Sequence, residues 1–575
     1  MSILKFINKI ILQLLISIFF FSNIHAKNLD IYYRSDKVSD YFSGIISLSE
    51  NNYNKSYNFL KKLDGLEDSH PSFASTYLYS LINSEKFNEA FKFSKKLENK
   101  NIDSFESNLI IGIYYLKNKR YELAREYSSK IKKKYSQTPL QKLISQTFYN
   151  WVNFEKNKYQ DAQKAIDNID PRLLNMKKIQ NVFLQCYYDT SKVDNDFKKL
   201  ISYKDLDNNS DFSRYNFFYA NYLISKKDIN TAEKIINLSL DIYPRNLILN
   251  QLKLDLQNKM IKNYTNIFNC KDPSHIIAEI FYITANAMSV KNIYSFSNFY
   301  LNLAKYLNPD FVSFETLTAQ NFSNIDNLKN SKKSYLKIKL HGDIFEWYAS
   351  QKISRILSEQ KKEEEALELL KKSYNKIKKP NIYQTYDLAS FLRTHDEYKE
   401  SIKYYSKVLN LIDKNHSLYP KSTDGRGIAY ERVGDWEKAE KDFLNSLSVE
   451  PNQAYVINYL AYSWIEKGKN IDKSLQMLKK ANQLKKNDGY IIDSLGWALF
   501  KLKRYKEANR YLQIAVRLMP VDPVVNDHYA DSLWMINKKL QARYHWNHVL
   551  NFKKTEKDLK KQINNKFISG PDANL

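Results

Sequence analysis

The chain has 575 residues, of which 43% are hydrophobic and 14% aromatic. This apolar content is enough for a packed structure and excludes a globally disordered chain. With 11 Gly and 12 Pro and no sustained alternation of apolar and polar residues, the sequence also excludes an all-β fold, which needs frequent turns. The length exceeds what one compact core usually supports, but a repeat protein can grow this long. We therefore expect an all-helical chain.

The formal net charge is +26, from 89 Lys and Arg against 63 Asp and Glu. The charge is spread along the whole chain and most of the excess is Lys, whereas recognition of bases and phosphates usually recruits Arg. Together with abundant Asn, Ile and Tyr, this composition is typical of an AT-rich genome. Nucleic-acid binding is therefore only a third hypothesis, which predicts a steep salt dependence and a cytosolic location.

The first predicted element is a signal peptide at residues 1–26. Two lysines precede an apolar stretch from Ile10 to Phe21, and Ala26 offers a small residue for cleavage. A retained membrane anchor is the alternative, but an apolar helix of about 12 residues reaches only about 18 Å, against a hydrocarbon core of roughly 30 Å. No later segment approaches 18 uninterrupted apolar residues. The sequence therefore predicts an exported, periplasmic protein that has no stable membrane anchor after cleavage. Peripheral association with a membrane is compatible with this prediction.

A small residue then returns about every 34 positions. Ser56, Ala90 and Ala124 stand 34 apart, and each follows by 12 residues a helix position suited to close packing. Such a period indicates a helical repeat solenoid, in which each unit buries its apolar face against its neighbours. Weaker units continue downstream at Ala162, Ala232 and Ala285. Residues 172–210 and 246–275 are helical in character, but the pattern does not fix their register.

The two cysteines, Cys186 and Cys270, lie 84 residues apart, or about two and a half repeats. In a regular solenoid with neighbouring helices about 10 Å apart, they should be separated by roughly 20 Å or more. A disulfide needs Cα atoms within about 7 Å. We therefore expect two free thiols unless the solenoid folds back on itself.

The repeat is plainest between Gly489 and Pro520. Leu495, Gly496 and Leu499 mark a first helix, Ala508 and Leu512 mark a second, and Pro520 ends it. The small residues allow the two antiparallel helices to approach closely. Applied to the flanking units, the same register predicts these repeat-packing residues: Gly427, Ala439, Gly496, Ala508, Pro520 and Ala542.

The segment from Asn458 to Leu550 contains the stretches NYLAYSW, DGYIIDSLGWALFKLKRYKEA and DHYADSLWMINKKLQARYHW. These stretches resemble the tetratricopeptide repeat proteins exported to bacterial envelopes. The resemblance implies an all-α fold, a right-handed α-solenoid of about fifteen helix-turn-helix repeats. We divide the chain into a signal peptide (1–26), degenerate repeats (27–346), a regular array (347–556), and a capping helix with a tail (557–575).

The capping helix is predicted from an apolar stripe at Leu559, Ile563 and Phe567, which recur every four residues. Lysines between them, including Lys566, are expected to form the solvated face. A basic amphipathic helix of this kind could also contact a membrane, but the stripe is thin for that role. We therefore interpret it as the polar-faced cap that a solenoid end requires.

No catalytic motif, phosphate-binding loop or dinucleotide fingerprint occurs in the sequence, so we expect a protein that is not an enzyme and has no cofactor. The nearest group to a metal site consists of His528, His545 and His548 with Asp527 and Asp531. We interpret these residues as polar positions on exposed faces of a terminal repeat, and predict neither a metal ion nor catalysis there.

Binding can be predicted more positively. The family resemblance implies that the first helix of each unit lines a concave wall, where aromatic rings alternate with carboxylates. Tyr and Trp give large contact areas at little entropic cost, although these rings could instead pack between adjacent helices. The predicted wall comprises Tyr383, Tyr386, Ser390, Arg393, Asp424, Glu431, Arg432, Tyr455, Asn458, Tyr462, Tyr490, Asp493, Trp497, Asp527, Asp531 and Trp534.

Its carboxylates should repel an anionic ligand, so a neutral or basic segment is the expected partner. The first functional hypothesis is a periplasmic adaptor that binds such a segment of an envelope protein, chiefly through Asn458, Tyr462, Asp493 and Trp497. The alternative is a factor that binds or processes cell-wall or exported polysaccharide, with tyrosines stacking on sugar rings. The fold alone does not choose between these functions.

Overall fold

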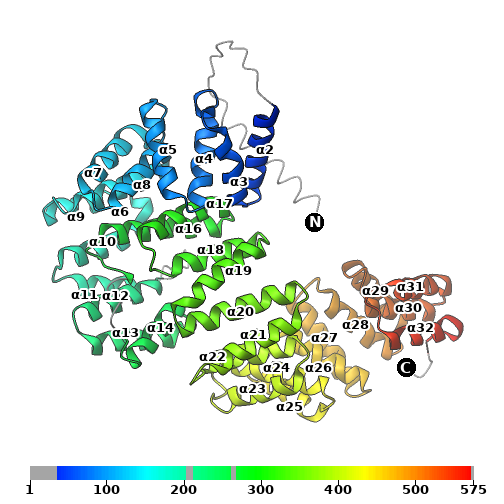
Figure 1. Ribbon diagram of the computed structural model, residues 1–575. Helices are drawn as coiled ribbons and strands as arrows, with labels where there is room; N and C mark the ends of the chain where they lie inside the picture. Colours follow the sequence, from blue (N-terminus) through cyan, green and yellow to red (C-terminus); the bar gives the residue numbers. More distant parts are fainter. Residues whose placement is uncertain (1–34, 203–211, 261–266, 572–575) are drawn as a thin grey trace. The chain divides into compact units, whose positions relative to one another are not determined.

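The computed structural model describes residues 35–202, 212–260 and 267–571, and these residues form helices and turns without strands. The chain divides into two compact units, Met1–Ile338 and Lys339–Leu575 (Figure 1). Consecutive helices pair, giving eight pairs in the first unit and six in the second among the described residues. The all-α repeat fold predicted from the sequence is confirmed. The predicted signal peptide lies outside the described residues.

The first unit contains the degenerate repeats. Its α-helices are α2 (Ser35–Ser49), α3 (Tyr53–Leu60), α4 (Pro71–Asn83), α5 (Phe87–Asn99), α6 (Phe105–Lys117), α7 (Tyr121–Lys130), α8 (Pro139–Asn153), α9 (Tyr159–Asp167), α10 (Leu174–Tyr188), α11 (Val193–Ser202), α12 (Arg214–Ser225), α13 (Ile229–Ile242), α14 (Leu247–Gln257), α16 (Pro273–Val290), α17 (Tyr294–Leu307), α18 (Ser313–Asn324) and α19 (Leu328–Ile338). Short turns η1 (Lys61–Leu63), η2 (Leu66–Asp68), η3 (Ile131–Tyr135) and η4 (Pro171–Leu173) join some of them.

The second unit contains the regular array. It begins with the turn η6 (Lys339–His341) and continues through α20 (Asp343–Glu359), α21 (Glu363–Asn375), α22 (Ile382–Thr394), α23 (Tyr398–Leu409), α24 (Tyr419–Arg432), α25 (Trp436–Val449), α26 (Ala454–Glu466), α27 (Ile471–Leu484), α28 (Gly489–Lys501), α29 (Tyr505–Leu518), α30 (Pro523–Met535) and α31 (Lys539–Asn551). The chain then forms α32 (Lys557–Ser569), which packs on α31 at the predicted capping position.

Small residues lie where the paired helices of the second unit approach each other. Ala439, Ala508 and Ala542 have no exposed surface. A Cβ atom added at Gly427 would lie 2.8 Å from the Phe443 ring, and one added at Gly496 would lie 2.6 Å from Leu512 Cγ. Side-chain volume is therefore excluded at these positions by the facing helix, as the repeat register predicts. The sixth residue of that set, Pro520, follows the end of α29.

Replacing Gly496 by Leu should force α28 and α29 apart, because an added Cβ also lies 3.2 Å from the Leu512 backbone nitrogen. We expect a loss of about 1–3 kcal/mol in unfolding free energy, the usual effect of overpacking a core. Urea unfolding followed by tryptophan fluorescence measures this loss. Lys506→Leu, at an exposed position of α29, is the matched control. Equal stability of the two variants would show that the assigned register is wrong.

The first unit departs from a simple solenoid because α16 and α17 pack against helices much earlier in the chain. Helix α16 contacts α8, and α17 contacts α4 and α6 (Figure 1). Buried amides join the two layers: Asn302 Nδ2 donates to Asn83 Oδ1 at 3.1 Å, and Asn298 Nδ2 donates to the Tyr53 hydroxyl at 3.1 Å. The first helices of the early repeats are therefore covered by the chain's own later helices.

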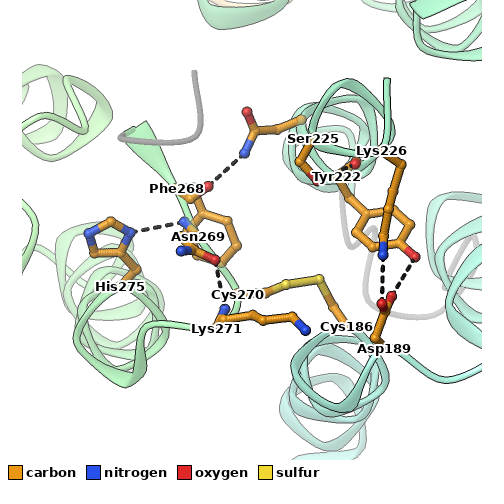
Figure 2. Close-up of a disulfide and its surroundings, with 11 residues drawn as sticks. Cys186, Asp189, Tyr222, Ser225, Lys226, Phe268, Asn269, Cys270, Lys271 and His275 are labelled. Carbon is orange, nitrogen blue, oxygen red and sulfur yellow. Dashed lines mark hydrogen bonds and ion pairs between the residues drawn. A yellow bond between two sulfur atoms is a disulfide. The ribbon is translucent and has the colours of Figure 1, made fainter. Parts of the chain in front are cut away.

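This folding back overturns the expectation of two free thiols. Cys186, in the last turn of α10, forms a disulfide with Cys270, and their Cα atoms lie 6.0 Å apart rather than roughly 20 Å (Figure 2). The segment that carries Cys270 returns to α10 and α12, where Asn221 Nδ2 donates to the Phe268 carbonyl at 2.7 Å. The Phe268 ring also packs on Phe218, with ring centroids 4.4 Å apart. These contacts bring the two cysteines together despite their separation of 84 residues.

A candidate groove and a buried charge cluster

A groove of about 520 Å³ runs along the first helices of successive repeats in the second unit. Residues of α24, α26, α28 and α30 line it, so each repeat contributes one helix to the same wall. This arrangement follows from the repeat register, because equivalent first helices stand side by side. The lining consists of Glu431, Arg432, Asn458, Tyr459, Tyr462, Ser463, Glu466, Lys467, Tyr490, Asp493, Ser494, Asp522, Val524 and Val525.

Six of the sixteen wall residues predicted from the sequence meet in this groove: Glu431, Arg432, Asn458, Tyr462, Tyr490 and Asp493. The Tyr490 side chain is 55% exposed, and it therefore offers an aromatic surface to a ligand. The side-chain oxygen of Asn458 is buried and has no hydrogen-bond donor among the described residues. The groove thus offers an accessible aromatic ring, which suits an extended peptide, whereas the unpaired Asn458 oxygen lies beneath its surface.

The groove has more acidic than basic side chains. Four carboxylates line it, against the two cations Arg432 and Lys467. Two of the carboxylates are held by aromatic donors: the Tyr459 hydroxyl donates to Glu431 at 2.9 Å, and Trp497 Nε1 donates to Glu466 at 2.6 Å. The charge balance favours a ligand that carries positive charge.

The other ten predicted wall residues lie outside the groove. Tyr455 is 54% exposed and donates its hydroxyl hydrogen to Asp488, the N-cap residue of α28, at 3.0 Å. Trp497, Asp527 and Asp531 are buried within the end of the array. The remaining wall positions that do not line the groove are Tyr383, Tyr386, Ser390, Arg393, Asp424 and Trp534.

The buried members of the predicted wall form a charge cluster beneath α32. His528 Nδ1 lies 2.9 Å from Asp493 Oδ2, and the imidazole stacks on the Trp497 ring with centroids 3.9 Å apart. Lys566 Nζ donates to Asp527 Oδ2 and to Asp531 Oδ2, each at 2.7 Å. These contacts link the first helices α28 and α30 to the capping helix through ion pairs shielded from solvent.

The sequence interpretation of two features in this region is wrong. Lys566 is 9% exposed and belongs to the buried face of α32, not to its solvated face. It lies on the same helix as Ile563, the fully buried residue of the predicted stripe. His528 and Asp531 are likewise buried rather than exposed polar positions. The signal that could have identified the cluster is charge. Asp527 and Asp531 lie one helical turn apart, and two buried carboxylates so close together require a cation. The helix that follows supplies it as Lys566.

His545 and His548 do not join this cluster. His545 Nδ1 lies 3.1 Å from Asn526 Oδ1, and His548 is exposed. Within residues 35–202, 212–260 and 267–571, no three His, Cys, Asp or Glu side chains are grouped closely enough to hold a metal ion. The same residues include no helix that is both long and apolar enough to span a membrane.

Burial and neighbouring charges shift the pKa values of the cluster. Burial opposes protonation of His528, but the Asp493 carboxylate outweighs it and raises the pKa of the imidazole. Burial, together with the charge of Asp527, raises the pKa of Asp531 to about 7. Asp531 and Asp527 raise the pKa of Lys566 although burial acts in the opposite direction. The folded array therefore binds protons more tightly than the unfolded chain.

This predicts that the second unit loses stability between pH 6 and pH 8. A pKa raised on folding gives stabilisation that is complete below the unfolded pKa and disappears as the pH rises through the folded one. The stabilisation from Asp531 is lost between pH 3.8, the unfolded pKa, and about pH 7. The stabilisation from His528 begins to be lost above pH 6.5. The expected loss is on the order of 1 kcal/mol.

Urea unfolding at the two pH values, read by tryptophan fluorescence, tests this prediction. His528→Gln should reduce the difference between pH 6 and pH 8. His548→Gln, which changes an exposed histidine of the neighbouring helix, should leave it unchanged. Stability that rises with pH in the parent protein would contradict the assigned pKa directions.

The fold defines a class, the helical repeat proteins, in which equivalent helices of successive units stand side by side. Comparison with known sequences identifies the repeats of the second unit. Residues 336–550 match the profile of the family described as "Tetratricopeptide repeat", so this part of the chain is an array of tetratricopeptide repeats. Tetratricopeptide repeats are in general scaffolds for protein–protein interaction.

Similarity to individual proteins is limited to short segments. The "TPR repeat-containing protein PA4667" of Pseudomonas aeruginosa is 29% identical over 122 residues, 21% of this chain and 19% of that protein. The "TPR repeat-containing protein MJ1428" of Methanocaldococcus jannaschii is 27% identical over 161 residues, 27% of this chain and 26% of that protein. The chain thus spans about a fifth and a quarter of these two relatives.

Solved structures of repeat proteins are also similar to parts of the chain. A tetratricopeptide repeat protein from Parabacteroides merdae gives a TM-score of 0.32 at 18% identity, covering 38% of this chain and 85% of the other. MamA from Desulfovibrio magneticus RS-1 gives a TM-score of 0.27 at 17% identity, covering 31% of this chain and 97% of the other.

Proposed function

We propose that the protein is an exported, non-enzymatic scaffold whose C-terminal unit binds an extended neutral or basic segment of an envelope protein. The groove of the second unit carries this proposal. It combines the exposed Tyr490 ring with four carboxylates against two cations. A basic segment would gain charge complementarity there, and its side chains could pack on the Tyr490 ring.

Export is supported by two independent features. The first is the pattern of residues 1–26, which is typical of a secretory signal. The second is the disulfide between Cys186 and Cys270, because such bonds form and persist mainly in oxidising compartments such as the bacterial periplasm. A periplasmic location would also place the groove within reach of exported proteins.

The proposal is tested by capturing the partner from the groove. A photo-crosslinking amino acid placed at Tyr490 should yield covalent adducts with a protein in exporting cells. The same amino acid at Tyr544, which is 60% exposed on the second helix of its repeat, should yield none of these adducts. Adducts that resist proteases and are removed by glycan hydrolases would favour the polysaccharide hypothesis instead.

A matched pair of tyrosines then localises the binding surface. Tyr490 and Tyr455 are almost equally exposed, at 55% and 54%, but only Tyr490 lines the groove. With a crosslinker at a neutral position outside the groove, Tyr490→Ala should reduce capture about tenfold, as expected for loss of an aromatic anchor. Tyr455→Ala should leave it within about twofold. Equal losses would move the binding site away from the groove.

A further inference from the structure

A second, smaller pocket lies within the first unit and differs from the groove in chemistry. It measures about 110 Å³ and is formed where the segment around α3 and the end of α4 face α17, α18 and α19. Its lining is mostly polar, with several asparagine amides and five charged side chains. The pocket exists because α17 folds back onto α4, so it is a product of the tertiary structure rather than of a single repeat.

Most of its charged groups already have partners. Lys305 Nζ lies 3.0 Å from both Glu85 Oε1 and Glu315 Oε2, and Lys337 Nζ lies 3.4 Å from Glu85 Oε1. The Lys305 ammonium lowers the pKa of Glu85 to about 2, so this carboxylate is ionised at neutral pH. The two carboxylates are therefore neutralised within the protein and offer little to a ligand cation.

Three hydrogen-bond donors of the pocket have no partner among the described residues. The amide nitrogen of Asn83, a residue only 7% exposed, lacks an acceptor although its oxygen accepts from Asn302. The neighbouring Ser84 hydroxyl also has no partner. Lys333 lines the pocket and pairs with none of the described carboxylates. An unpaired amide nitrogen and an unpaired hydroxyl, both shielded from solvent, and the exposed ammonium of Lys333 thus belong to residues that line the same pocket.

A carboxylate matches this set of donors. It accepts hydrogen bonds through two oxygens and about four lone-pair positions and donates none. Among the lining residues, three lysines face two glutamates, so one positive charge is left over. The volume corresponds to roughly four water molecules at about 30 Å³ each, which suits an acid of a few carbon atoms. We propose that this pocket binds a small organic carboxylate, independently of the partner held by the groove.

Calorimetric titration of the full chain with butyrate, phosphate and 1-butanol at constant ionic strength tests the assignment. Butyrate should bind saturably, whereas 1-butanol, an uncharged molecule of the same length, should not. Phosphate should bind more weakly, because its second negative charge meets no spare cation in the pocket. Absence of saturable butyrate binding, or equal binding of the alcohol or of phosphate, would overturn the proposal.

Two variants connect binding to the named donors. Lys333→Gln removes the unpaired ammonium and should weaken butyrate binding about tenfold, the loss expected for one charge-assisted hydrogen bond. Lys332→Gln, its neighbour outside the pocket lining, should bind like the parent. Asn83→Asp keeps the oxygen that accepts from Asn302 but replaces the free N–H by negative charge, so it should weaken binding by at least about tenfold. Equal affinities of the two lysine variants would contradict the proposal even if Asn83→Asp failed to fold.

Discussion

Replacing Lys566 by Met should destabilise the C-terminal unit by about 3–5 kcal/mol, the usual result of removing one partner from a buried ion pair. Asp527 and Asp531 are 5% and 0% exposed, and Lys566 Nζ lies 2.7 Å from an oxygen of each. Without the ammonium, the only donor described for Asp531 is Trp546 Nε1, at 3.2 Å. The two carboxylates would then face each other in a medium that solvates neither.

Urea unfolding followed by tryptophan fluorescence measures this effect, since six of the seven tryptophans belong to residues 339–575. Lys561→Met, at an exposed position of the same helix, controls for the loss of a lysine and should change stability little. The deficit of Lys566→Met should also shrink at low pH, because protonation discharges the carboxylates. A variant as stable as the control would show that α32 does not depend on this cluster.

The repeat pattern predicted the local geometry of the second unit well. Gly496, Ala508 and Ala542 lie where paired helices meet, and Ile563 anchors the capping helix. These positions depend on helix periodicity and on the volume that a neighbouring helix leaves, and both are properties of a short stretch of sequence. The same register placed Asn458 on the wall that forms the groove.

The sequence could not separate the open part of that wall from its closed end. Asn458 and Asp527 occupy equivalent positions two repeats apart, yet Asn458 lines the groove while Asp527 is buried and bonds to Lys566 of the capping helix. The difference arises because α32 occupies the place that a further repeat would take. An amphipathic pattern identifies such a helix, but it does not say which lysine turns inward.

The repeat pattern of the sequence also did not predict the long-range packing within the first unit. Asn302 reaches Asn83 across 219 positions of sequence, and Asn298 reaches Tyr53 across 245. Asparagines at these places look like ordinary polar positions of degenerate repeats. Only the complementarity between α17 and the early helices reveals their role, and the small polar pocket of the first unit follows from it.

Removing the disulfide between Cys186 and Cys270 should cost the first unit about 4.5 kcal/mol by the loop-entropy relation, since the bond closes a loop of 84 residues. When the double variant Cys186→Ser, Cys270→Ser unfolds, its chain gains the full conformational freedom of that loop. The unfolded parent chain, which keeps the bond, does not. Native packing retains Phe268 against Phe218 and the hydrogen bond from Asn221. The folded variant should therefore keep its helicity while unfolding at lower urea.

Far-UV circular dichroism during urea unfolding, with and without dithiothreitol, measures the difference. Reductant should lower the stability of the parent to that of the double variant and leave the variant itself unchanged, which separates the bond from any effect of the serines. Thiol titration in denaturant should find no free thiol before reduction and two after it. Two free thiols in the unreduced protein would contradict the disulfide, and α10 would then not be covalently joined to the segment before α16.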